Sequence, residues 1–407
     1  MTKPGNPLGG SIRVVLTIII VAILTSCTSP PQRLTPSGLN SHYNITSTLP
    51  FPDYIDACRQ MLIKARYEEN SEEKGQAIEA NLPFELRPDQ NSERNSSTGK
   101  YENGILLIHG LSDSPYEMKP LAQYFQARGF LVRTILLPGH GSRPGDLLKV
   151  TAEDWQRSCT YGITGIASQV DHVYLGGFST GGALAVDYAL RHPEEITGLY
   201  LFAPALKIKT VYAPLSLPVK TFKDWLSIHD DRDYARYESF SVNGAAQVYR
   251  LTQKINHLVR REGKVLEMPV RIVLSLEDIV IDSRHTVETF QQWMVNPENQ
   301  ILLYTRAPLP PEFTDSRIMV TPPPPQSGIL DYSHLSLLLP PTDPHYGING
   351  NYRNCLHYRP ESPQATSCLA GKADWLGEVS QTNLTRGIVQ RMTFNPSFTD
   401  MLSFLNH

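Results

Sequence analysis

The stretch that decides the fold is residues 173–182, VYLGGFSTGG. It opens with a short run typical of a strand buried on both faces of a sheet. Helical sequence follows and ends before Pro193, which cannot continue a helix. Gly177 and Gly181 lie two positions either side of Ser179, where a sharp turn leaves no room for side chains. The stretch therefore predicts a strand, a sharp turn that carries Ser179, and a helix.

This turn prepares Ser179 for nucleophilic chemistry. A G-x-S-x-G sequence between a strand and a helix is the nucleophile-elbow pattern. The start of the helix places free N–H groups and the positive end of the helix dipole beside the serine. A serine hydroxyl becomes a useful nucleophile when a base takes its proton and an acid orients that base. We therefore expect a histidine and a carboxylate from elsewhere in the chain to join Ser179.

Strands and helices alternate around this turn. The apolar run at 105–108 predicts a buried strand, and Ser114 with Pro115 begins a helix with a capping box. Strictly alternating elements imply parallel strands joined by helical crossovers. The sequence thus predicts an α/β fold with a doubly wound, mostly parallel sheet. Further strands are expected at 130–136, 199–202, 270–274 and 301–304.

Later segments interrupt the alternation. Residues 205–268 have helical apolar spacing in their second half, so we expect a helical cap inserted over the sheet's C-terminal edge. Residues 308–325 contain seven prolines, which indicates an irregular loop. Beyond Pro340 the chain is rich in Asn, Tyr and Pro, and we expect it to wrap around the domain.

Two further motifs carry a resemblance to a known family. His109-Gly110 closes the strand at 105–108, and Leu-Pro-Gly-His-Gly at 137–141 follows the next strand. Together with the turn at Ser179, these segments resemble the α/β-hydrolase superfamily, especially carboxylesterases and monoacylglycerol-lipase-like enzymes. The resemblance extends over about residues 103–204 and continues later only through short motifs.

The resemblance implies a set of parts and boundaries. It assigns the oxyanion hole to the backbone N–H groups of Leu111 and Thr180, and it needs neither a metal nor an organic cofactor. His109 and His140 are expected to shape their loops, although His140 could also rim the substrate pocket. The expected architecture is a core in two parts, residues 51–204 and 269–339, with a cap at 205–268 and a C-terminal extension at 340–407.

Asp278 is the expected acid of the site. It follows directly after the strand at 270–276 and matches the strand-end position that the family uses. Glu277 and Asp282 are neighbouring alternatives that could instead face solvent or cap a helix.

His334 is the expected base. It lies in the segment Asp-Tyr-Ser-His-Leu-Ser-Leu at 331–337, just after the last core elements, where the family places its histidine. His285, His345 and His357 are the alternatives; His285 follows Asp278 too closely, and the other two lie in the C-terminal segment.

The N-terminus has the features of an export signal. Lys3 and Arg13 flank its start, and the apolar run at 14–24 is short for a transmembrane helix. Small residues before Cys27 resemble the bacterial lipobox, which implies a lipidated Cys27 as the mature N-terminus; an uncleaved anchor is the alternative. We therefore expect a lipid-anchored protein of the bacterial cell envelope, with a signal peptide at 1–27 and a flexible tether at 28–50.

Four further cysteines would then lie in an oxidising compartment, where an even number favours disulfides. Cys355 and Cys368 close a short loop, so we expect them to pair. That leaves Cys58 to pair with Cys159. A zinc site is the alternative, but no CxxC or His/Cys spacing supports it.

Composition limits the possible partners. With 37 basic and 40 acidic residues the formal net charge is −3, and no basic helix is present, so nucleic acid is not an expected partner. The sequence does not predict an oligomeric state. The expected reaction is hydrolysis of a small-molecule or lipid-like acyl ester through an acyl-enzyme, beside a membrane.

Two alternatives remain open from the sequence. An aminopeptidase would need a site for a free amine, which Asp230, Asp231 and Asp233 could supply. A non-catalytic envelope lipoprotein could also retain the fold for binding. The substrate's acyl group stays undefined, because the apolar cap residues could line a pocket or form the cap's own core: Tyr212, Phe222, Trp225 and Leu226.

Overall fold

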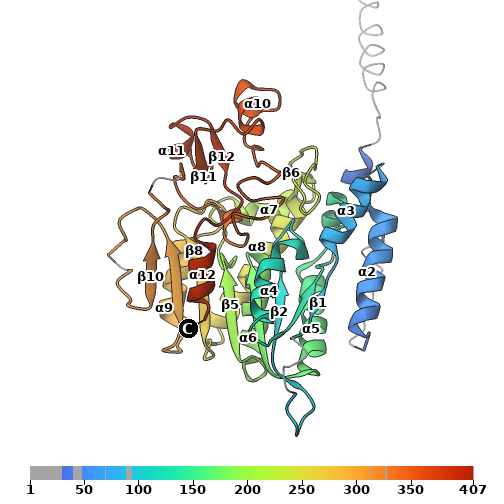
Figure 1. The fold of residues 1–407 in the computed structure, drawn as a ribbon, viewed down its shortest axis with the longest axis vertical. Coiled ribbons are helices and arrows are strands. Elements are labelled where there is room, and N and C mark those ends of the chain that lie inside the picture. Colours follow the sequence, from blue (N-terminus) through green and yellow to red (C-terminus); the bar gives the residue numbers. More distant parts are fainter. Residues whose placement is uncertain are drawn as a thin grey trace, which may run out of the picture.

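The centre of the molecule is an eight-stranded sheet with the order β1-β3-β2-β4-β5-β8-β9-β10 (Figure 1). All neighbouring strands are parallel except β1 and β3, which run antiparallel. The predicted doubly wound, mostly parallel sheet is therefore confirmed. This computed structural model of the chain describes residues 30–39, 48–68, 70–88, 94–311, 313–325 and 328–406. The sheet strands are β1 (Glu85–Leu86), β2 (Tyr101–Ile108), β3 (Leu131–Ile135), β4 (Val170–Phe178), β5 (Gly198–Phe202), β8 (Val270–Ser275), β9 (Gln300–Tyr304) and β10 (Ile318–Thr321).

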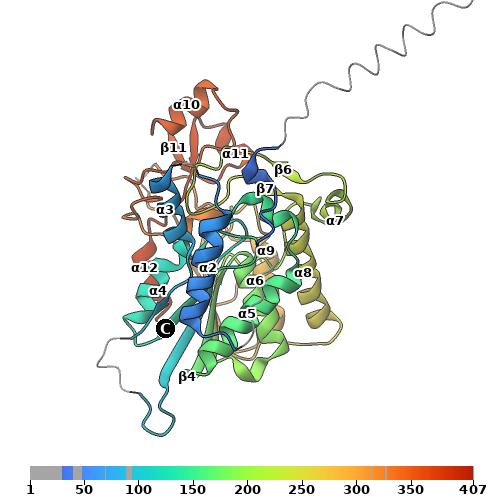
Figure 2. The ribbon, with the colours of Figure 1, turned by 90° about the vertical axis from the view of Figure 1, so that its right-hand side faces the viewer.

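Helices cover both faces of the sheet. Figure 2 shows α4 (Lys119–Gln126) and α12 (Phe398–Phe404) on one side, with α5 (Ala152–Ala167) and α6 (Thr180–Arg191) on the other. Both faces of the central strands are consequently buried, as their continuous apolar runs predict. The remaining helices of the body are α2 (Phe51–Ala65), α3 (Ser71–Asn81) and α9 (Ser283–Trp293), with short 3₁₀ turns η1 (Gln32–Leu34), η3 (Pro115–Met118), η4 (Pro144–Leu148) and η5 (Pro193–Glu195).

The register of the central strands aligns their carboxyl ends. Ile108 of β2 pairs with Gly177 of β4, and Phe178 pairs with Phe202 of β5. Residues that follow these strands therefore meet at one edge of the sheet. Ligands of doubly wound folds bind outside this edge.

The proline-rich segment at 308–325 is not wholly irregular, so this prediction was wrong in part. Its residues Ile318–Thr321 form β10, which pairs in parallel with β9 at the edge of the sheet. The prolines cluster on both sides of this strand and are absent from it. An edge strand tolerates flanking prolines, because one of its sides needs no hydrogen-bonded neighbour.

The segment expected to form the cap combines irregular and helical structure. It begins with the short turns η6 (Ala213–Leu215) and α7 (Ser216–Val219), followed by a two-stranded antiparallel ribbon and the long helix α8. The apolar side of α8 is buried, with Leu251 at 0% and Ile255 at 2% exposure. The ribbon strands are β6 (Trp225–Ser227) and β7 (Phe240–Ser241), and α8 covers Val242–Arg260.

The C-terminal segment lies above the carboxyl edge of the sheet, near the cap, and α12 returns to the sheet's face (Figure 1). It has a small sheet of its own, in which β11 and β12 pair in parallel. The predicted disulfide between Cys355 and Cys368 is present. Its elements before α12 are α10 (Pro363–Leu369), β11 (Trp375–Gly377), α11 (Gln381–Leu384) and β12 (Val389–Arg391); the 3₁₀ turn η7 (His334–Ser336) precedes the segment.

The predicted pairing of Cys58 with Cys159 is wrong. Both thiols are buried, and no disulfide joins them. Tyr161 of α5 packs against Tyr54 of α2, with 5.0 Å between ring centroids. Residues two apart on a helix point to nearly opposite sides, so Cys159 faces away from α2 and toward Asp187 of α6. Burial raises the pKa of the Cys159 thiol, and the charge of Asp187 raises it further.

The N-terminal predictions lie largely outside the described residues. The signal peptide at 1–27, the lipidation site Cys27 and residues 28–29 and 40–47 of the tether belong to this part. The prediction of a flexible tether is wrong for residues 30–39, which pack against the body: Leu34 is buried, Arg33 pairs with the buried Asp231, and Ser37 donates to Asp146. Among the described residues, we find no helix with the length and apolar character needed to span a membrane.

Candidate active site

Ser179 lies on the sharp turn between β4 and α6. Its φ of 51° and ψ of −112° place it in a region that residues with side chains rarely adopt. A Cβ atom at Gly177 would lie 2.4 Å from the backbone of Gly181, and one at Gly181 would lie 2.1 Å from the carbonyl oxygen of Ile108. The turn therefore requires glycine on both sides of Ser179, as the sequence pattern indicated.

The structure brings Ser179, Asp278 and His334 into contact. His334 Nε2 lies 3.1 Å from Ser179 Oγ, and His334 Nδ1 lies 2.5 Å from Asp278 Oδ2. All three side chains are buried, Asp278 completely. Ser179 precedes His334 by 155 positions in the sequence, and Asp278 precedes it by 56. The three side chains nevertheless form one continuous series of hydrogen bonds, in the order predicted from the sequence.

The loop after β8 holds Asp278 as an ionised carboxylate. Its Oδ1 accepts hydrogen bonds from the N–H groups of Val280 and Ile281, at 2.7 and 3.0 Å. Burial alone would raise the pKa of Asp278, but His334 and these N–H groups outweigh burial and lower it below its usual value. The carboxylate can therefore keep the proton of the imidazole on Nδ1, which leaves Nε2 to accept the proton of Ser179.

The residues predicted to form the oxyanion hole line the same cavity as Ser179. Thr180 is the first residue of α6, so its N–H has no acceptor within the helix. The Leu111 N–H donates no hydrogen bond to another part of the chain that the structure describes. Two backbone donors thus remain available at the nucleophile.

Two buried histidines fix the loop that carries Leu111. His109 Nε2 accepts from the N–H of Leu137 at 3.0 Å, and His140 Nε2 accepts from the N–H of Ser112 at 3.1 Å. Burial lowers the pKa of His140 to about 4 and also lowers that of His109, so both rings stay neutral and can accept these bonds. His140 is fully buried; it holds the loop rather than rimming the pocket.

A cavity of about 840 Å³ opens above Ser179. One wall consists of apolar cap residues, and another comes from the C-terminal segment. Four charged residues also line it: Asp113, Arg236, Glu238 and Arg391. The walls include Leu111, Phe178, Ile208, Leu215, Val219, Leu226, Val242, Val248, Ile279 and Ile281 from the core and cap, and Tyr352, Asn354, Leu356, His357, Val379 and Arg391 from the C-terminal segment.

The alternative acids serve other purposes. Glu277 Oε1 accepts a hydrogen bond from the Thr305 hydroxyl at 2.6 Å. Asp282 caps α9 through the N–H of His285 and forms an ion pair with Lys207. Neither contacts His334, so the geometry favours Asp278.

The other histidines considered as the base do not contact Ser179. His285 belongs to α9, beside Asp282. His345 Nε2 lies 2.9 Å from Asp233. His357 lines the cavity, and its ring nitrogens have no hydrogen-bond partner among the described residues. Among the four candidate histidines, His334 is the one that contacts Ser179.

The acidic residues of the cap stabilise the cap rather than forming an open amine site. Asp231 accepts from the hydroxyl of Ser239 and pairs with Arg33. Asp233 accepts from the Tyr346 hydroxyl at 2.7 Å. Asp230 is an exposed partner of Arg232.

The C-terminal segment is the part of the site that sequence reasoning missed. Besides its cavity residues, it supplies Glu378, whose carboxylate accepts the backbone N–H of His334 at 3.0 Å. Glu378 is fully buried. The sequence offered one sign of this role: Glu378 directly follows the apolar run Trp375–Gly377. A charged side chain that is buried with such a run needs a buried partner.

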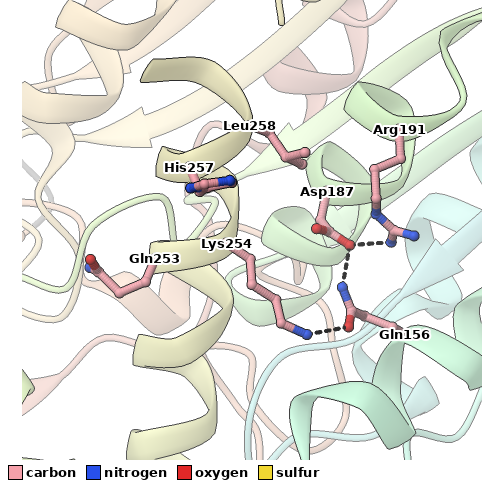
Figure 3. A pocket seen from close by; sticks show the side chains of 7 residues that line it. All are labelled: Gln156, Asp187, Arg191, Gln253, Lys254, His257 and Leu258. Atoms are coloured by element: carbon pink, nitrogen blue, oxygen red, sulfur yellow. Dashed lines mark hydrogen bonds and ion pairs between the residues drawn. The ribbon is translucent and has the colours of Figure 1, made fainter. Parts of the chain in front are cut away.

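Other polar clusters lie away from Ser179. A pocket of about 510 Å³ lies between α6 and α8. In it Asp187 accepts hydrogen bonds from Gln156 and Arg191 (Figure 3). A surface group with metal-ligating atoms within 4.8 Å of one another lies just after the far end of α6: His192, Glu194 and Glu195. Neither cluster reaches the nucleophile.

Comparison with known proteins places this architecture in a family. The family model described as serine aminopeptidase, S33, matches residues 99–307. A thermostable monoacylglycerol lipase of Bacillus sp. (strain H-257) is 31% identical over 194 residues, which cover 46% of this chain and 75% of that protein.

The chain belongs to the S33 family of hydrolases. A Bacillus subtilis carboxylesterase is 20% identical over 205 residues, or 50% of this chain and 77% of that protein. This S33 member is an esterase- and lipase-like hydrolase with the α/β-hydrolase fold. The match ends before His334, so His334 and the C-terminal segment lie outside it.

Solved structures with similar folds include a metagenome-derived lipolytic enzyme, with a TM-score of 0.47 and 24% identity, covering 55% of this chain and 86% of that one. A monoacylglycerol lipase of Paleococcus ferrophilus has a TM-score of 0.44 and 18% identity, with 54% and 87% coverage.

Proposed function

We propose that this S33 hydrolase cleaves carboxylic esters of lipid-like acyl groups, with Ser179 as nucleophile, His334 as base and Asp278 as the orienting acid. One observation carries the proposal: Asp278, His334 and Ser179 form an unbroken chain of buried hydrogen bonds. The chain ends at a serine on a strained turn, beneath a cavity of about 840 Å³.

Each residue has a defined part in the reaction. Ser179 Oγ attacks the ester carbonyl while His334 Nε2 takes its proton, and the protonated imidazole then gives that proton to the leaving alcohol. A water molecule deprotonated by His334 cleaves the acyl-enzyme in the second half of the reaction. Asp278 stabilises the imidazolium in both halves through Nδ1.

The oxyanion formed in each half would be bound by the N–H groups of Leu111 and Thr180. One such donor typically contributes about 3 kcal/mol to transition-state stabilisation. Because His109 and His140 hold the Leu111 loop through hydrogen bonds, the N–H group of Leu111 is in place before substrate binds. Preorganised donors of this kind need no rearrangement during the reaction.

The walls of the cavity support a lipid-like acyl group. Most cap residues that line it are aliphatic or aromatic. Apolar side chains also gather around the cap's surface, with Phe222 at 89%, Val211 at 82% and Tyr212 at 70% exposure. Exposed apolar surface beside a ligand cavity is a feature of proteins that meet lipid or another apolar surface. Hydrolysis of a monoacyl or lysolipid ester fits this arrangement.

We further propose that the enzyme acts at the bacterial cell envelope, anchored by a lipid on Cys27. The sequence Leu-Thr-Ser-Cys at residues 24–27 supports this location. The disulfide between Cys355 and Cys368 is consistent with an oxidising compartment. Metabolic labelling with a fatty-acid analogue would test the anchor, since Cys27→Ser should abolish incorporation.

The central experiment compares wild type with Ser179→Ala. The variant should lose activity on esters of graded acyl length by at least about 10⁴-fold, together with labelling by a fluorophosphonate. Aminoacyl substrates tested in parallel separate an esterase from a peptidase. Labelling retained at another serine, or faster cleavage of aminoacyl amides than of esters, would refute the proposal.

A matched pair of variants tests the acid. Asp278→Asn should lower kcat by about 10⁴-fold, because an amide cannot hold the imidazole in the required tautomer. Glu277→Gln, one residue away, should leave kcat within about threefold of wild type, since Glu277 contacts Thr305 instead. The reverse order of effects would reassign the acid to Glu277.

A further inference from the structure

The segment that carries His334 has little local structure to hold it. His334 begins η7, a single 3₁₀ turn of three residues. The chain that leads to it from β10 contains four consecutive prolines, Pro322 to Pro325. A base must be held to within about 0.5 Å of its working position. The restraint on His334 therefore has to come from contacts outside its own loop.

The C-terminal segment supplies that restraint through Glu378. Glu378 Oε2 accepts the backbone N–H of His334 at 3.0 Å, and Oε1 accepts that of Val379 at 2.9 Å. Arg391 approaches both oxygens, with Nε 2.8 Å from Oε1 and Nη2 3.1 Å from Oε2. Two backbone donors and a guanidinium thus surround one fully buried carboxylate.

Further bonds run between the same two segments. Asp331 Oδ1 accepts the N–H of Glu378 at 2.6 Å, and Oδ2 accepts from the amide of Asn383 at 2.7 Å. The Ser333 hydroxyl donates to the carbonyl of Met392 at 2.5 Å. Glu378, Asn383 and Met392 thus bind the loop from Asp331 to His334.

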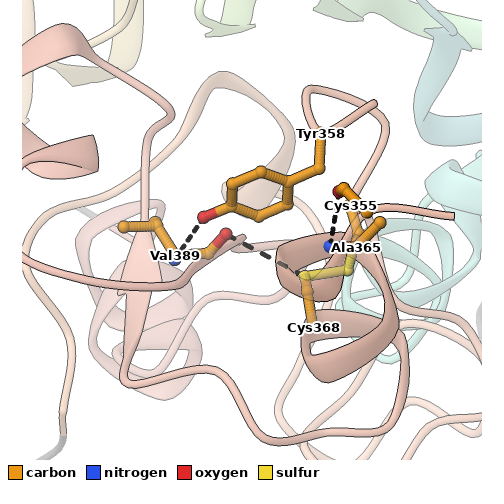
Figure 4. Close-up of a disulfide and its surroundings, with 6 residues drawn as sticks. Cys355, Tyr358, Ala365, Cys368 and Val389 are labelled. Carbon is orange, nitrogen blue, oxygen red and sulfur yellow. Dashed lines mark hydrogen bonds between the residues drawn. A yellow bond between two sulfur atoms is a disulfide. The ribbon is translucent and has the colours of Figure 1, made fainter. Parts of the chain in front are cut away.

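The disulfide region in turn holds the strand that carries Arg391. The N–H of Arg391 donates to the carbonyl of Asn354, next to Cys355, at 3.1 Å. Figure 4 shows the N–H of Val389 donating to the Tyr358 hydroxyl, at 2.8 Å, beside the disulfide. A covalently closed loop thereby supports β12, which supports Glu378.

We propose that Glu378 is a positioning residue for His334: it fixes the backbone of the base so that the imidazole meets Ser179 and Asp278 at the same time. This inference rests on the proposed function of the three residues. The family match ends at residue 307, so the device belongs to this chain's own C-terminal segment. Displacement of a catalytic group by about 1 Å can cost on the order of 10²-fold in rate.

The surroundings of Glu378 require a carboxylate. Each of its oxygens faces one backbone N–H and one nitrogen of Arg391. An amide in its place would direct an NH₂ group at donors and leave at least one of them without an acceptor, which is costly in a buried site. Glutamine is therefore a disruptive substitution here in spite of its shape.

The test uses the full chain with Glu378→Gln, and Glu361→Gln as the matched control. Glu361 lies in the same segment and is exposed. We expect Glu378→Gln to lower kcat for a short activated ester by about 10²-fold. KM should change by less than about threefold, because the carboxylate acts on the base and not on substrate binding. The rate of fluorophosphonate labelling at Ser179 should fall in parallel, and Glu361→Gln should match wild type.

Glu378→Asp serves where the glutamine variant does not fold. It keeps the charge but withdraws the oxygens by one methylene, about 1.5 Å, so kcat should fall by about tenfold at unchanged KM. A folded Glu378 variant with wild-type kcat would overturn the inference, as would a loss seen entirely in KM. Ser179→Ala in the same assay separates the two proposals: if it stays active, the proposed function itself fails.

Discussion

Ser179 and His334, the proposed nucleophile and base, are held in opposite ways. Ser179 owes its position to about ten consecutive residues: a buried strand, glycines at 177 and 181, and a helix. His334 depends on residues that lie far along the chain, 44 positions away at Glu378. Its neighbour Ser333 reaches 59 positions, to Met392. One half of the site is thus a local backbone structure, and the other is a tertiary assembly.

This difference explains where the family relationship is visible. A strand–turn–helix must satisfy the same steric limits in any chain that uses it, so it leaves a recognisable pattern. A loop held by a separate segment can be supported by many different contacts, and no short pattern follows from them. The family match accordingly covers the turn and stops before His334.

Among changes that leave Ser179, Asp278 and His334 in place, the largest effect is expected when the local half is broken at Gly181. In Gly181→Ala the new Cβ would lie 2.1 Å from the carbonyl oxygen of Ile108, which is backbone and cannot rotate away. We expect ester hydrolysis to fall by at least about 10²-fold, measured as kcat/KM. Gly75→Ala, in α3 with nothing within 4 Å of its Cβ, should change stability by no more than about 1 kcal/mol. Full activity in Gly181→Ala would contradict the local account of the turn.

A second prediction loosens the tertiary half. Replacement of both Cys355 and Cys368 by serine opens a loop with a sequence separation of 13 and should lower the free energy of unfolding by about 3 kcal/mol. Hydrogen exchange should accelerate in the segment from Asp331 to Ser336, here called the base loop, at Ser336, whose N–H donates to the carbonyl of Ser333. It should not accelerate at Ala183, whose N–H donates to the carbonyl of Ser179.

The control for the disulfide variant is Cys159→Ala, which alters a buried thiol in α5. It should leave exchange in the base loop unchanged. Equal acceleration at Ser336 and Ala183 in the disulfide variant would show that the two halves are not held independently.

The smallest effect concerns the pH dependence of stability that comes from His140, which holds the loop carrying Leu111. The pKa of His140 is about 4 in the folded protein, against about 6.5 for an exposed histidine. The unfolded chain therefore binds a proton that the folded protein does not, and stability falls as pH drops from 6.5 toward 4. This group alone should cost about 2 kcal/mol between pH 7 and pH 5.

Denaturant unfolding of wild type and His140→Gln at these two pH values measures the effect. The glutamine can still accept from the Ser112 N–H but has no proton to gain, so its stability should depend less on pH. Equal slopes in both proteins would exclude His140 as a source of the pH dependence.

The sequence by itself determined the central strands of the sheet, the turn at Ser179 and the order of the candidate residues. Continuous apolar runs, glycine spacing and a carboxylate at a strand end are local consequences of packing and steric limits, so they can be read without the fold. The short loop between Cys355 and Cys368 also favoured their pairing, and the disulfide is present.

Only the tertiary structure decided which distant groups meet. Cys159 faces away from Cys58, because Tyr161, two positions further along α5, is the residue that packs against α2. The tertiary structure made a strand within the proline-rich segment, where β9 offered a free edge. It also brought Glu378 under the backbone of His334. Buried polar contacts between remote segments depend on the complete path of the chain, and that path is not encoded in any short stretch of it.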